Sequence, residues 1–117
     1  MKMPISEIAD RYSIARLKSE RIEGVDLSTE LSLLNEELKN YPCIELFVDR
    51  LYNINGEIWD LESDIRKGKE GILGLEEVGR RAILIRGRNK IRVGIKNEMV
   101  EKYNEGFKDI KMNHASI

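Results

Sequence analysis

Apolar residues recur at helical spacing along most of the chain. Near the N-terminus, Ile8, Tyr12, Ala15 and Ile22 fall on one face of a 3.6-residue repeat. This pattern predicts a helix over residues 6–23.

Four leucines at positions 27, 31, 34 and 38 form a second stripe, at i, i+4, i+7 and i+11. The helix that they predict begins close to Asp26 or Ser28, whose side-chain oxygens are good caps. It stops before Pro42, which cannot continue a helix. Because the link to the preceding helix is short, the two helices are expected to form an antiparallel hairpin.

A third and longer stripe runs through residues 43–67. Gly56 interrupts it at a cost of about 1 kcal/mol relative to alanine, but the apolar positions keep the same phase on both sides. We therefore expect one helix of about 24 residues, roughly 36 Å long. Two short helices cannot cover it on every side, so we expect a homo-oligomer, a dimer, in which this helix packs against its symmetry mate. The stripe consists of Ile44, Phe47, Val48, Leu51, Ile54, Ile58, Leu61 and Ile65.

The segment from residue 73 to 105 permits two interpretations. Apolar spacing favours a helix over 73–86 and another over 89–105, with a break around Gly87. The alternative is a β-hairpin at 82–95, because apolar and basic residues alternate there. The fold expected is all-α, with four to five helices and an antiparallel helical hairpin packed on a long third helix. An α+β fold with the small hairpin is the alternative.

Composition and length indicate one folded domain. Apolar residues make up 41% and charged residues 35% of 117 residues, which is typical of a globular protein. We expect a single domain over 1–107 and a frayed tail at 108–117. Cys43 is the one cysteine, so an intramolecular disulfide is excluded. We find no signal-peptide pattern and no apolar run of membrane length, so we expect a cytoplasmic protein without a membrane partner.

Three stretches carry recognisable patterns: Ile5–Ile14, Lys18–Ile22 and Ile54–Arg66. The last contains a Trp-Asp-x-Glu-x-Asp-Ile-Arg motif and is the most specific. Together they resemble a family of small bacterial and phage proteins known as domain of unknown function 6165. The resemblance covers roughly residues 5–100. It implies helices throughout, including the segment after residue 73, and it implies no function, because the family has none assigned.

Charge is divided unevenly along the chain. Residues 1–79 hold 17 acidic and 10 basic side chains, whereas residues 80–117 hold 4 acidic and 10 basic ones. Seven basic residues and no acidic residue lie between Arg80 and Lys96. Either the two parts of the chain pair with each other, or the basic part binds an anion.

The second interpretation predicts a charged groove for an anionic small molecule, such as a nucleotide or nucleotide sugar, or for a partner. A nucleic-acid-binding accessory protein is a further alternative, which the lack of aromatic residues between positions 60 and 102 and the isoelectric point of 5.9 disfavour. The candidate anion-binding residues are Lys18, Arg21, Arg66, Arg81, Asn89, Arg92 and Lys96. The polar motif expected beside them consists of Asp10, Glu20, Asn55, Trp59, Asp60, Glu62 and Asp64.

An alternative enzymatic function rests on two acidic pairs. Glu20 with Glu23, and Glu57 with Asp60, have the i, i+3 spacing that places carboxylates on one helical face. The pairs resemble those of all-α nucleotide pyrophosphohydrolases, which implies a Mg²⁺ ion held between helices. No residue is predicted to be catalytic, and a non-enzymatic binding or assembly protein without a cofactor is the favoured interpretation.

Overall fold

The computed structural model describes residues 3–69 and 74–104, and within these ranges it contains four helices and no strand. They are α1 (Ile5–Arg21), α2 (Ser28–Leu38), α3 (Ile44–Lys69) and α4 (Leu75–Tyr103). The all-α expectation is confirmed. The expected tail at 108–117 lies outside the described residues.

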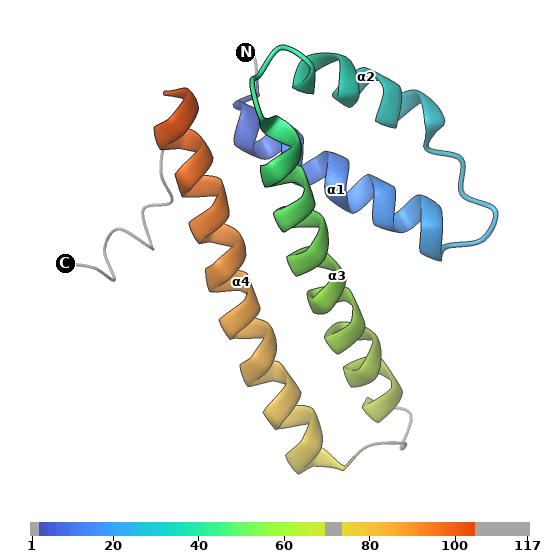
Figure 1. The fold of residues 1–117 in the computed structure, drawn as a ribbon. Coiled ribbons are helices and arrows are strands. Elements are labelled where there is room, and N and C mark those ends of the chain that lie inside the picture. The colour runs from blue at the N-terminus through green and yellow to red at the C-terminus, as the bar shows by residue number, and fades with distance from the viewer. Residues whose placement is uncertain (1–2, 70–73, 105–117) are drawn as a thin grey trace.

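Two helical hairpins make up the fold (Figure 1). The long helices α3 and α4 run antiparallel and side by side, and α1 lies across one half of this pair. α2 packs on α1 and runs back along it, which confirms the expected antiparallel hairpin and its packing on the long third helix. The other half of α3 and α4 projects beyond α1 and α2.

The core lies where α1 crosses the α3–α4 pair. Apolar residues of all four helices contribute to it, and Leu51 and Met99 are completely buried at its centre. Tyr103 closes one end through edge-on ring contacts with Tyr41 and Phe47. The buried apolar residues are Ile5, Ile8, Ala9, Ala15, Leu17, Leu38, Ile44, Val48, Leu51, Ile54, Ile58, Ile95 and Met99.

The third helix is continuous through Gly56, as the unbroken apolar phase indicates. A methyl group at Gly56 would lie 3.4 Å from the guanidinium of Arg21 and 3.7 Å from Leu17 Cδ2, because α1 crosses at this point of α3. These are ordinary van der Waals distances, so an alanine would fit there, whereas a larger side chain would displace its neighbours.

The expected break around Gly87 is wrong, and so is the alternative hairpin at 82–95, because α4 runs unbroken from Leu75 to Tyr103. One glycine costs only about 1 kcal/mol. On either side of it, Arg81 and Arg88 are held by carboxylates of α3, and Ile95 packs in the core. These tertiary contacts outweigh the local preference for a turn.

No helix within the described ranges is both long enough and apolar enough to cross a membrane.

Candidate functional site

A polar cluster lies buried where α1, α3 and α4 meet. Asp10 Oδ1 accepts hydrogen bonds from Asn55 Nδ2 and Arg92 Nε, both at 3.0 Å, and Asp10 Oδ2 accepts a further one from the Arg92 guanidinium. Asn55 Nδ2 also donates to Ser13 Oγ at 2.8 Å, and Ser13 Oγ donates to the Asp10 carbonyl at 2.7 Å. One carboxylate therefore joins three helices.

Electrostatics keeps this carboxylate ionised. The Asp10 side chain is 4% exposed and that of Arg92 is 30% exposed. Burial acts to raise the pKa of Asp10, but hydrogen bonds from Arg92 and Asn55, with the charges of Arg92 and Lys96, outweigh it and hold the pKa below its ordinary value. Leaving one member of a buried pair unpaired costs about 3–5 kcal/mol. The cluster therefore fixes the crossing of α1 over α3 and α4.

Further ion pairs join α4 to the other helices. Lys96 contacts Glu7 of α1 at 2.6 Å. Three pairs connect α3 and α4 along their length: the Arg50 guanidinium donates to Glu98 at 2.6 and 3.0 Å, Arg88 Nε donates to Glu57 at 3.0 Å, and Arg81 donates to Asp64. The three pairs are Arg50–Glu98, Glu57–Arg88 and Asp64–Arg81. Four basic residues of the segment 80–96 are thus bound to carboxylates of α1 and α3.

The predicted anion-binding residues are spread along the molecule. Lys96 contacts Glu7 near the start of α1. Arg21, the last residue of α1, instead contacts Asp60 of α3 at 2.6 Å. Glu7 and Arg21 are separated by about 21 Å along the helix at 1.5 Å per residue. Lys18 and Arg66 are exposed, Asn89 is half-buried, and Arg81 and Arg92 bind carboxylates.

Acidic residues of the predicted polar motif likewise have separate partners. Arg21 lies over the Trp59 ring, 5.9 Å from its centre, while it binds Asp60. Glu20 accepts a hydrogen bond from the Tyr52 hydroxyl, which raises the pKa of Tyr52. Of the remaining acidic motif residues, Glu62 is exposed and Asp64 binds Arg81.

The four carboxylates of the Mg²⁺ hypothesis are not brought together. Glu57 faces Arg88 of α4 and Asp60 faces Arg21 of α1, while Glu20 faces Tyr52 and Glu23 lies exposed beyond α1. Within the described ranges, no group of three or more His, Cys, Asp or Glu side chains is placed to hold a metal ion.

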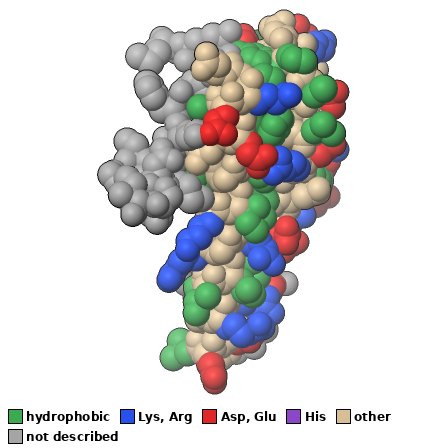
Figure 2. Space-filling model, turned by 60° about the vertical axis from the view of Figure 1, so that its left-hand side comes forward, with side chains coloured by type: hydrophobic (Ala, Val, Ile, Leu, Met, Phe, Trp, Pro, Cys, Tyr) green, Lys and Arg blue, Asp and Glu red, His purple; other side chains and the backbone are tan. Residues whose placement is uncertain are grey.

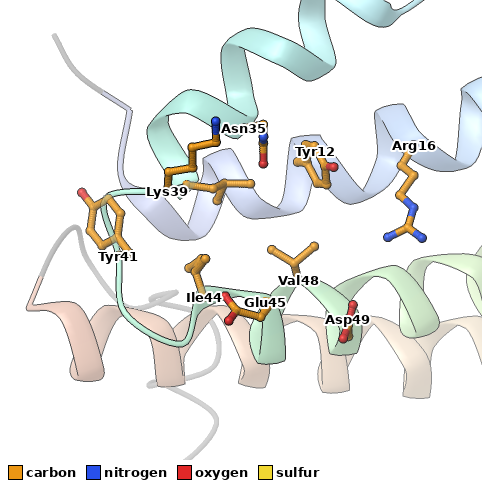
Figure 3. A pocket seen from close by; sticks show the side chains of 10 residues that line it. Tyr12, Arg16, Asn35, Lys39, Tyr41, Ile44, Glu45, Val48 and Asp49 are labelled. Atoms are coloured by element: carbon orange, nitrogen blue, oxygen red, sulfur yellow. The ribbon is translucent and has the colours of Figure 1, made fainter.

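A surface cleft of about 400 Å³ opens between α1, the end of α2 and the start of α3 (Figure 3). Leu38, Ile44 and Val48 contribute apolar surface. Arg16 approaches from α1 and Lys39 from the end of α2. Both cations have carboxylate neighbours, Glu20 at 3.4 Å and Glu36 at 3.2 Å. None of the predicted anion-binding residues lines this cleft.

No family model matches the chain, and no curated protein or solved structure matches it.

A further surface was missed by the sequence analysis. The outer face of α4, defined here by Ile83, Gly87 and Ile91, is open to solvent and carries apolar side chains beside the basic Arg80 and Lys90: Ile83 is 64% exposed and Ile91 is 49% exposed. Figure 2 shows hydrophobic and basic side chains together on the projecting part of the molecule. From the sequence, only residue ranges were predicted for this segment, because periodicity alone does not show which face of a helix remains uncovered.

Proposed function

We propose that the protein is a non-catalytic assembly protein that binds a helical segment of a protein partner on the outer face of α4. The observation that carries the proposal is the exposure of Ile83 and Ile91 on the outer face of α4. Apolar side chains displayed together on a projecting helix are suited to packing against a second helix.

The charges support an interaction of this kind. Arg81, Arg88 and Arg92 are neutralised by Asp64, Glu57 and Asp10 within the chain, so the basic segment stabilises the hairpin that presents the apolar face. Binding a free anion to these guanidiniums would break existing pairs.

A thermal-shift screen with nucleotides and nucleotide sugars, with and without Mg²⁺, tests the proposal against its rivals. We expect no ligand to raise the melting temperature. A metal-independent rise that is lost in Arg81→Ala would establish an anion groove instead. A Mg²⁺-dependent rise that is lost in Glu57→Gln would establish a metal-dependent nucleotide enzyme instead.

Photo-crosslinking in cells provides the positive test. A benzophenone amino acid at position 83 should form a covalent protein adduct whose linked peptide, identified by mass spectrometry, belongs to a helix. The same group at the exposed Ser32 of α2 is the matched control and should give no adduct. No adduct from position 83, or equal yields from both positions, would overturn the proposed function.

A further inference from the structure

Three glycines lie in the interior of α4, at positions 79, 87 and 94. Each weakens the helix by roughly 0.5–1 kcal/mol relative to alanine. Within the described part of the chain, a methyl group at any of the three would meet no atom within 4 Å. Gly56 of α3 differs, because α1 crosses directly above it. The packing of the described chain therefore does not account for the glycines of α4.

Two of these glycines belong to a regular stripe. Its six positions are separated by four, three, four, three and four residues, which is the seam of a heptad repeat. At 100° per residue they fall within an arc of about 80° on one side of α4. Each is exposed or half-exposed. The stripe, called the α4 seam below, consists of Arg80, Leu84, Gly87, Ile91, Gly94 and Glu98.

The α4 seam complements itself when its direction is reversed. In an antiparallel pair centred on residue 89, each seam position faces the seam position at the same distance on the other side of residue 89. The two side chains of each such pair differ in size or in the sign of their charge. Leu84 corresponds to Gly94, and Ile91 corresponds to Gly87, so each large side chain meets a glycine. Arg80 corresponds to Glu98, so each end of the seam meets the opposite charge; within the chain these two exposed side chains also pair with Glu77 and Arg50, so an intermolecular pair would share or replace those contacts.

We propose that the partner of the α4 face is a second copy of this chain, bound antiparallel through the α4 seam with a two-fold axis at the level of Asn89. The inference rests on the proposed function and names its partner. An isologous contact of this kind requires a surface that complements itself, which the seam is. The dimer expected from the sequence was placed on the long third helix; the seam places it on α4.

A parallel pairing of two seams is unfavourable. It would align Arg80 with its own copy and Glu98 with its own copy, and it would place glycine opposite glycine. In the antiparallel pairing, the glycines allow the two axes to approach to about 8 Å, the lower end of the usual range, with the larger side chains filling the space. The seam from Arg80 to Glu98 is about 27 Å long. One helix pair makes a small interface, so we expect a dissociation constant of roughly 1–100 µM.

Reversing the charges at the two ends of the seam tests the antiparallel register. Dimerisation is measured by sedimentation velocity at protein concentrations of about 5–500 µM, which bracket the expected dissociation constant. R80E alone places two acidic pairs across the interface, and E98R alone places two basic pairs there. Each variant should dimerise at least about tenfold more weakly than the unmodified protein. An equimolar mixture has two opposite-charge pairs, and we expect it to recover the dimer. A mixture that stays as monomeric as the single variants would overturn the antiparallel register.

Glycine substitution tests the close approach without changing charge. Gly87→Leu should stabilise the monomer, because the open space accepts the side chain, and should abolish the dimer by colliding with Ile91 of the second copy. Gly79→Ala is the matched control: it lies off the seam and should raise the melting temperature without changing the dissociation constant. E98R loses the contact with Arg50 and could fail to fold. In that case, comparing Gly87→Leu with Gly79→Ala still tests whether the α4 seam forms the dimer.

The outcomes separate the inference from the proposed function. If the unmodified protein stays monomeric over the whole range, or if Gly87→Leu dimerises as well as the control, the self-association is overturned. A crosslinked helix from a different protein at position 83 would then leave the proposed function standing. A dimer that the seam variants weaken in the predicted way supports both.

Discussion

Replacing the Asp10 carboxylate by an amide tests whether the buried cluster holds α1 to the α3–α4 hairpin. Asp10→Asn preserves shape but removes the charge that neutralises Arg92. Unpairing a buried ion costs about 3–5 kcal/mol. Because Arg92 retains 30% exposure and can recover some hydration, we expect a loss of about 2–4 kcal/mol in the free energy of unfolding. The total free energy of unfolding of a typical domain is only about 5–15 kcal/mol.

The assay is urea denaturation followed by circular dichroism, with the free energy of unfolding extrapolated to water. The matched control is Asp49→Asn, which neutralises an exposed carboxylate of α3 and should change the free energy by less than about 0.5 kcal/mol. A loss below about 1 kcal/mol for Asp10→Asn would refute a structural role for the buried pair.

The difference in the free energy of unfolding between the unmodified protein and Asp10→Asn should depend on pH in a defined direction. The pKa of Asp10 in the folded protein lies below its ordinary value of 3.8, so near that pH the unfolded chain binds more protons. The stabilisation is therefore complete above about pH 5 and is lost as the pH falls through the pKa of the folded state. The unmodified protein and Asp10→Asn should converge in stability only once the pH falls below the pKa of Asp10 in the folded protein. A gap that stays constant down to acid pH would show that Asp10 acts through packing rather than charge.

Three further changes probe other contacts. Gly56→Leu should lower the free energy of unfolding by about 1–3 kcal/mol in the same urea assay, because the side chain would displace Arg21 and Leu17. Tyr103→Phe, which removes the 2.6 Å hydrogen bond to the Pro42 carbonyl, should cost about 0.5–1 kcal/mol by thermal denaturation. Lys90→Ala should tighten self-association about two- to fivefold in sedimentation, because Lys90 flanks the α4 seam close to the proposed axis, where it would meet its own copy; unchanged or weaker association would contradict that placement.

Periodicity was sufficient to locate the first three helices, because the core buries a part of each predicted apolar stripe, although Ile22 at the end of the first stripe remains 41% exposed. It failed at Gly87, where local propensity favours a break but Arg81 and Arg88 are anchored on α3. That anchoring is a tertiary effect, and a single sequence contains no direct record of which carboxylate each arginine reaches.

The candidate residues show the same division. Asp10, Asn55 and Arg92 were all identified from the sequence, but Arg92 was assigned to an anion site and the other two to a polar motif. Their meeting in one buried cluster depends on the crossing of three helices. Ser13 was missed, although its position three residues after Asp10 on the same helix was an available signal. The uneven charge distribution had two interpretations, and the structure shows internal pairing for four basic residues of α4.

The half-covered α3–α4 hairpin has a consequence for local stability. Where α1 crosses, opening the hairpin requires the core to separate, so amide hydrogens there should exchange with solvent only through global unfolding. In the projecting half, only the contacts between α3 and α4 resist opening, and partial unfolding from that end costs less than unfolding the whole domain. A second α4 bound along the α4 seam would contact both halves of the hairpin, and in the projecting half it would add packing that α1 does not supply there. Dimerisation would thus stabilise the helix that forms the interface. Protection of the amide hydrogens in the projecting half of α3 and α4 from exchange would then rise with protein concentration.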